Sequence, residues 1–163
     1  AGFLGLLYYG AREFSRSLGA AIQISTDLVE PAFSPGDRLL IRKQNSYRRG
    51  DIVHSPAAGS LERVLALPGE DIRINAGGIF VNGRPLPKAL YPLSRRLIES
   101  PDLNGVSARV PERSYCILFP ADTRVYRGMT IYNNELFSHF MIPEGDIAGR
   151  AAFQYSPSIR RIR

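Results

Sequence analysis

Short apolar stretches separated by turn signals run along most of the chain from Ile22 onward. Such stretches, bounded by glycine, proline and asparagine, are typical of short strands. The 15 glycines and 12 prolines fall largely between these stretches, where they favour turns. The pattern therefore predicts a mainly β fold. The predicted strands are residues 38–43, 51–55, 61–67, 71–74, 79–81, 114–119 and 147–155.

Two of the turn signals predict tight hairpins. Asn75 to Gly78 separates the strands 71–74 and 79–81, and its glycines can adopt the positive φ values that short hairpin loops need. Asn82-Gly83 is a second tight-turn dipeptide. Residues 84–109 differ, because they hold four prolines among basic residues and show little alternation. We expect an irregular excursion there, with one short helix around 93–99.

The first nine residues are apolar, and charged residues follow from Arg12 onward. Nine residues of helix span about 14 Å, against roughly 30 Å of bilayer hydrocarbon, so this run cannot cross a membrane alone. It is either the end of a transmembrane helix or an amphipathic helix on a membrane or on its own domain. Phe3, Leu6, Leu7, Phe14 and Leu18 fit one helical stripe. We therefore predict a membrane-anchoring or membrane-proximal helix at 1–20 and a β domain at 21–163.

The length of 163 residues suits one globular domain. The formal charge of +6 favours anionic partners, and the basic residues are too scattered for a nucleic-acid face, so lipid headgroups explain them better. The single Cys116 excludes an internal disulfide and lies in an apolar strand, where we expect an inert thiol. His54 and His139 have no carboxylate at a ligand spacing, so neither a metal nor another cofactor is expected.

Several motifs occur along the chain in a fixed order. They are Pro31 with Gly36-Asp37-Arg38-Leu39-Leu40-Ile41, then Arg49-Gly50-Asp51-Ile52-Val53, Arg63-Val64-Leu65-Ala66-Leu67-Pro68-Gly69-Glu70, Ile79-Phe80-Val81-Asn82-Gly83, Val110-Pro111-Glu112, Ile142-Pro143-Glu144 and Ile147-Ala148-Gly149-Arg150. This order resembles bacterial signal peptidase I. The resemblance covers about Ile22 to Pro157, except for 84–109, and implies the coiled β-sheet domain of signal peptidases and LexA-like proteins. It also implies that the domain is held by N-terminal helices on the outer face of the cytoplasmic membrane, towards the periplasm or cell exterior.

The resemblance implies a serine nucleophile and a lysine general base, and neither residue is present at the matching position. The nucleophile position, three residues before Pro31, is Leu28, which has no hydroxyl. The lysine position, directly before Arg63, is Glu62. Burial lowers the pKa of a lysine, which makes it a base, but raises the pKa of a carboxyl group, which makes it a neutral acid. The chain therefore looks catalytically degenerate.

The supporting polar groups of the family are also incomplete. Thr26 stands where the family has a serine that helps to bind the oxyanion, although a threonine that caps a turn is the commoner reason for such a residue. The family's last motif is matched only by Ala121-Asp122-Thr123-Arg124, and its following serine and aspartate are missing from 125–137. Lys43 and Lys88 are the only lysines, and neither is spaced to activate Ser25.

In this family the substrate lies as an extended strand between two strands of the enzyme. The resemblance places the matching edges at Gln23, Ile24, Ser25 and Thr26, and at Gly59, Ser60 and Leu61. Our hypothesis is a non-catalytic, membrane-anchored protein that binds a peptide strand or a partner protein. It would serve either as an assembly chaperone or as a subunit of a membrane complex. The alternative is an active signal peptidase with relocated catalytic residues.

For the subunit interpretation, we expect contacts in the two segments that depart most from the family pattern, 84–109 and 125–137. Arg95, Arg96, Tyr126 and Tyr132 are the side chains there that alanine substitution would test.

Overall fold

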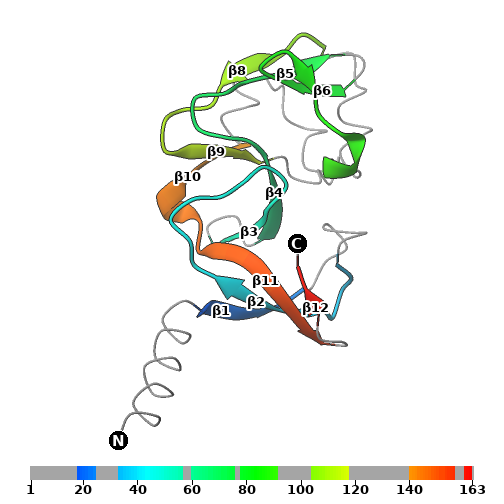
Figure 1. Ribbon diagram of the computed structural model, residues 1–163, viewed down its shortest axis with the longest axis vertical. Coiled ribbons are helices and arrows are strands. Elements are labelled where there is room, and N and C mark those ends of the chain that lie inside the picture. Colours follow the sequence, from blue (N-terminus) through cyan, green and yellow to red (C-terminus); the bar gives the residue numbers. More distant parts are fainter. Residues whose placement is uncertain are drawn as a thin grey trace, which may run out of the picture.

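The mainly β fold is confirmed by a computed structural model, which describes residues 18–24, 33–56, 60–75, 78–91, 104–117, 140–156 and 160–162. These residues form two antiparallel sheets and two short 3₁₀ helices, η1 (Lys88–Leu90) and η4 (Glu144–Asp146). The smaller sheet lies at one end of the molecule and strand β1 (Leu18–Gln23) lies near the other end (Figure 1).

The larger sheet has the strand order β1-β2-β11-β3-β4-β9-β10, with β12 paired to β11. Strands β2 and β3 are not paired with each other, because β11, which comes much later in the chain, lies between them. The position of β1 relative to β4 therefore depends on β11. The strands after β1 are β2 (Arg38–Arg42), β3 (Ile52–Ser55), β4 (Ser60–Ala66), β9 (Ser114–Ile117), β10 (Met141–Pro143), β11 (Gly149–Ser156) and β12 (Arg160–Arg161).

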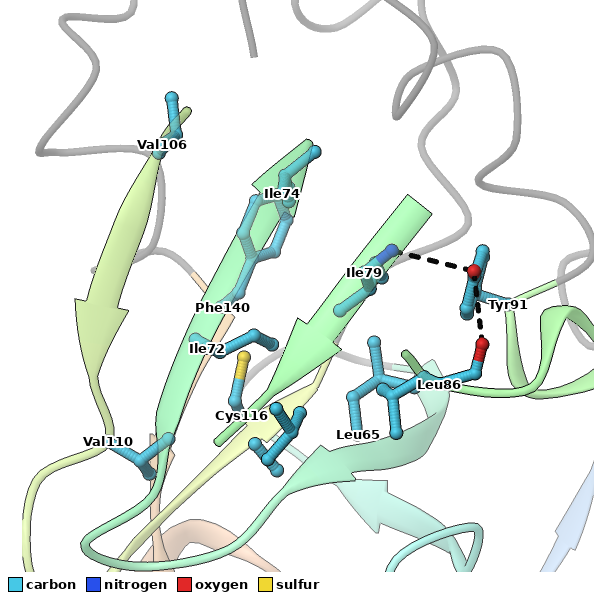
Figure 2. Packing of buried hydrophobic residues seen from close by; sticks show 12 residues of the cluster. Leu65, Ile72, Ile74, Ile79, Leu86, Tyr91, Val106, Val110, Cys116 and Phe140 are labelled. Carbon is cyan, nitrogen blue, oxygen red and sulfur yellow. Dashed lines mark hydrogen bonds between the residues drawn. The ribbon is translucent and has the colours of Figure 1, made fainter. Parts of the chain in front are cut away.

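The smaller sheet has the order β7-β6-β5-β8 and packs its inner face on a buried apolar cluster. Its strands are β5 (Asp71–Asn75), β6 (Gly78–Val81), β7 (Arg84–Pro85) and β8 (Ser107–Arg109). Ile72 and Ile74 of β5 point into this cluster with Phe140 and Cys116 (Figure 2). The Tyr91 hydroxyl closes one side of the cluster, where it accepts a hydrogen bond from the Ile79 N–H and donates one to the Leu86 carbonyl (Figure 2).

The sequence predicted the centres of most strands correctly. Each predicted strand overlaps an observed one, and the boundaries differ by one or two residues. Both hairpins are confirmed, since Asn75 pairs with Gly78 and Val81 pairs with Arg84. Asn82 and Gly83 have φ values of 50° and 76°, which are the left-handed conformations expected for that turn.

Two predictions about element boundaries are wrong. Leu18, Gly19 and Ala20, assigned to an N-terminal helix, belong to β1, because Leu18 pairs with Arg42 and Ala20 pairs with Ile41 of β2, with an irregularity at Gly19. Apolar spacing alone did not reveal this pairing. The rest of the predicted helix, residues 1–17, lies outside the described residues.

The excursion 84–109 is also more regular than predicted. It contributes β7, η1 and β8, and β8 completes the small sheet by pairing with β5. Prolines are tolerated there because β7 is an edge strand. The predicted helix at 93–99 lies outside the described residues.

The Glu70 carboxylate ties the two sheets together. It accepts two hydrogen bonds of 2.6 Å from Arg49, one of 2.8 Å from the Leu67 N–H and one of 3.3 Å from the Asn82 amide. Arg49 precedes β3 of the larger sheet, and Asn82 lies in the β6–β7 turn of the smaller one. The side chain of Glu70 is 19% exposed, so solvent screens these charges only in part.

Replacing Glu70 with alanine is expected to lower the free energy of unfolding by about 2 kcal/mol, because hydrogen bonds to charged groups are lost and the Leu67 N–H loses its acceptor. In a chain of this size this corresponds to a decrease in Tm of roughly 4–8 °C. Differential scanning calorimetry would measure it. Asp146→Ala, which removes an exposed carboxylate from η4, is the matched control and should change Tm little. Equal effects of the two substitutions would contradict the role assigned to Glu70.

Candidate functional site

The resemblance places the substrate-binding edges at β1, near Gln23, and at the start of β4, near Leu61. At both edges some backbone groups point away from the neighbouring strand. Among the described residues β1 pairs only with β2. The Ile24 N–H donates to Asp37 and its carbonyl accepts from Gly36, both at 2.8 Å. Because backbone groups alternate in direction along a strand, those of Gln23 point away from β2. The Gln23 side chain is exposed.

Strand β4 has a second such edge at its beginning. Its residues Ser60 to Arg63 pair with β3, whereas its pairing with β9 involves only Val64 and Ala66. The Val64 N–H donates to Asp51 on the β3 side. By the same alternation, the backbone of Leu61 points away from β3. Among the described residues, no strand pairs with this part of the edge.

Side chains beside these two edges meet in one buried cluster. Ile24, Leu61 and Phe33 pack together with Leu39, Ile41, Ile52 and Ala151. Ile24 and Phe33, the described residues on either side of 25–32, both belong to the cluster that contains Leu61. The structure thus brings together Ile24 and Leu61 of the predicted strand-binding residues. Ser25, Thr26, Leu28 and Gly59 lie outside the described residues, as do His139, Arg95, Arg96, Tyr126 and Tyr132.

Glu62 is buried completely in β4, with 0% exposure. It stands directly opposite Val53 of β3, and its side chain shares a face with Val53 and Val64 and points away from the face of Leu61. Val53 and Val64 belong to an apolar cluster with Tyr47, Tyr115 and Ile117. The position that the family pattern assigns to the general base is therefore a desolvated one.

Ser55 is a polar residue that the sequence did not single out. It pairs with Ser60, so its side chain lies on the same face of the sheet as Glu62. It is 1% exposed, and its hydroxyl makes no hydrogen bond with any described residue. A serine at the end of a predicted strand is too common to have indicated this position.

The other candidate side chains are unsuited to catalysis. Desolvation lowers the pKa of His54, so the neutral imidazole is favoured. Burial raises the pKa of Cys116, which places its thiol in the inert, protonated form. Lys43 follows β2 and Lys88 begins η1, and both are exposed. Neither lysine has the buried surroundings that a lysine general base requires.

The described strands form a curled antiparallel β domain. Residues 14–155 match the family model described as signal peptidase, peptidase S26. The chain therefore belongs to the signal peptidase S26 family.

Named relatives agree with this assignment. A signal peptidase I of Leptolyngbya laminosa is 29% identical over 93% of this chain and 74% of its own length. Two probable signal peptidases I of Synechocystis sp. are each 28% identical, over 84% and 93% of this chain and 71% and 68% of their own lengths.

In the part of the chain that the structure describes, no helix is both long and apolar enough to cross a membrane. Within the same residues, no group of three or more His, Cys, Asp or Glu side chains is placed to hold a metal ion.

Proposed function

We propose that this chain is a non-catalytic member of its family, which binds an extended segment of an exported protein between β1 and β4 and leaves it uncut. The backbone groups at the edges of Gln23 and Leu61 would supply hydrogen bonds to the segment. The cluster of Ile24, Phe33 and Leu61 would supply apolar contact beside them.

The observation that carries the proposal is the complete burial of a carboxyl group at the family's lysine position. Burial favours the neutral form of a carboxyl group, which is an acid and not a base. Glu62 is 0% exposed, so the position is desolvated but does not carry the lysine that the family's chemistry requires. Leu28 offers no hydroxyl group in any case.

The proposal extends to the protein's surroundings. The domain would lie on the outer side of the cytoplasmic membrane, held by an anchor within residues 1–20. Its charge of +6 suits a surface of anionic lipids. Its partner would be a secreted protein or the subunits of a membrane complex.

An active signal peptidase is the second candidate, and the relatives favour it. All three are named signal peptidase I, and they match 84–93% of this chain. In that case the nucleophile would be the hydroxyl group of another residue, such as Ser25 or Thr26, because Leu28 has none.

Photo-crosslinking of the membrane-embedded chain would test the proposal. A photoreactive residue at Gln23, on the predicted binding edge, is compared with one at Arg84, an exposed residue on the distant β7. We expect a preprotein to crosslink through position 23, but not through position 84, and to keep its signal peptide.

Two outcomes would contradict the proposal. Cleavage of the preprotein that is lost in Ser25→Ala or Thr26→Ala would establish the active peptidase. Equal crosslinking at both positions, or none, would show that the β1 edge does not bind a strand. If the proposal holds, mass analysis of the solubilised protein separates the two roles: a stoichiometric complex indicates a subunit and a single chain indicates a chaperone.

A further inference from the structure

The outer face of the small sheet contains a hollow of ≈ 780 Å³. Its lining includes Arg73 and Asn75 of β5, Phe80 of β6, and Ser107 and Arg109 of β8. Arg73 stands opposite both Phe80 and Ser107, so these side chains form one row across three strands. The inner face of the same sheet is filled by the cluster of Figure 2. The charged and polar side chains that line the hollow therefore lie on the solvent side of the sheet.

Strand β8 borders this hollow with an edge that no described residue pairs. The Ile74 N–H donates to the Val106 carbonyl, and the Val110 N–H donates to the Glu70 carbonyl, both at 2.8 Å. Because backbone groups alternate in direction, Ala108 also points towards β5, whereas Ser107 and Arg109 point outward. The edge thus offers the N–H and C=O groups of two residues, which is what an added strand requires.

The charges beside this edge favour an acidic ligand. Arg73 is exposed and makes no ion pair with any described residue. Arg109 has one long contact of 3.6 Å with Asp71, and both side chains are about two-thirds exposed, so this pair is weak. Two guanidinium groups face the hollow with one carboxylate between them. A ligand carboxylate could pair with either arginine.

We propose that the hollow and the β8 edge form a second peptide-binding surface, which takes an extended acidic segment as an additional strand beside β8. Alternate side chains of such a strand lie over one face. Acidic residues two positions apart would therefore face Arg109 and, further in, Arg73, while the Phe80 ring provides an apolar surface on the far side of Arg73. This surface is separate from the β1 and β4 edges, because the small sheet lies at the opposite end of the molecule from β1 (Figure 1).

Short edge strands with charged side chains also occur in proteins simply to prevent unwanted pairing, so binding has to be measured. The probe is a short fluorescein-labelled peptide of alternating valine and glutamate, titrated with the full-length chain at low ionic strength and followed by fluorescence anisotropy. The control peptide has lysine in place of glutamate. We expect the glutamate peptide to bind, the lysine peptide not to bind, and the affinity to fall as salt is added.

Variants locate the binding site. Arg73→Ala and Arg109→Ala are each expected to weaken binding by roughly three- to fivefold, as for a partly exposed ion pair. Arg84→Ala removes an exposed arginine of the same sheet that does not line the hollow, and should leave the affinity unchanged. Two further versions of the glutamate peptide carry N-methyl groups on alternate backbone nitrogens, at the odd positions in one and at the even positions in the other. Only one of them should lose binding, because only one set of the peptide's N–H groups faces β8.

The proposal is overturned if the glutamate peptide does not bind, if the lysine peptide binds equally, or if Arg73→Ala and Arg109→Ala have no more effect than Arg84→Ala. Equal binding of the two methylated peptides would also contradict the proposal that the peptide binds as an added strand beside β8. Crosslinking at Gln23 is independent of these measurements, so the proposed function and this second surface can fail separately.

Discussion

Replacing Gly149 with alanine is expected to lower the free energy of unfolding by about 3 kcal/mol. A Cβ atom at this position would lie 2.5 Å from the Arg42 carbonyl oxygen, 2.7 Å from its carbonyl carbon and 2.8 Å from a methyl group of Ile41. Two of these atoms are backbone atoms of β2, so no side-chain rotation can relieve the contact. Strand β2 would have to move away from the start of β11.

That movement would also affect the proposed binding site. Gly149 pairs with His54 of β3, and the next residue, Arg150, pairs with both Arg42 of β2 and Val53 of β3. The start of β11 thus sets the distance between the half of the sheet that carries β1 and the half that carries β4. We expect crosslinking through position 23 to decrease together with stability.

Thermal unfolding of Gly149→Ala would measure the change, which corresponds to a decrease in Tm of roughly 6–12 °C. Gly145→Ala is the matched control. Position 145 has an ordinary backbone conformation, and a Cβ atom there would meet nothing within 4 Å. A Gly149→Ala protein as stable as Gly145→Ala would show that β2 and β11 are not in the close contact described here.

The sequence predicted the strands well because each buries one face against the core, and that requirement produces the alternation. Strand β5 is an example, with Ile72 and Ile74 buried while Asp71 and Arg73 are exposed. Sheet pairing could not be predicted in the same way. Strand β8 has only three residues, and only its pairing with β5 identifies it as a strand. Strand β10 likewise depends on its pairing with β9.

The motifs that identified the family include residues whose hydrogen bonds connect the strands of the two sheets. Glu70 joins Arg49 to the turn that contains Asn82. Asp51 accepts hydrogen bonds from the Arg48 N–H at 2.8 Å and from Arg150 at 3.1 Å, which links the start of β3 to β11. These contacts hold the strands in place whether or not the chain cleaves a peptide. A chain can therefore keep the motifs and still lack the catalytic residues.

The candidate site was only partly predictable for the same reason. The edges at Gln23 and Leu61 follow from the motif order, and their backbone groups, which no described residue pairs, agree with it. The burial of Ser55 on the face of Glu62 depends on the register between β3 and β4, which sequence alone does not determine. The hollow over β5 and β8 similarly required the position of β8 to be known.

The double substitution Leu28→Ser with Glu62→Lys is expected to give the chain signal peptidase activity that neither substitution gives alone. Position 62 already provides the full burial that a lysine general base needs, because desolvation lowers the pKa of a lysine and leaves it neutral. The serine supplies the nucleophile that the base activates. Nucleophile and base act as a unit, so their effects are not additive.

Preprotein cleavage by the double variant should exceed that of the wild type and of both single variants by about 10²-fold, the lower end of what a positioned general base provides. The rate should rise with pH as the lysine loses its proton, which a purely structural effect would not produce. Gel analysis of a radiolabelled preprotein at several pH values measures both. A folded double variant without activity would show that Leu28 and Glu62 do not occupy the catalytic positions. Equal activity of the wild type would show that the chain already carries a functional nucleophile elsewhere, and the non-catalytic proposal would then be wrong.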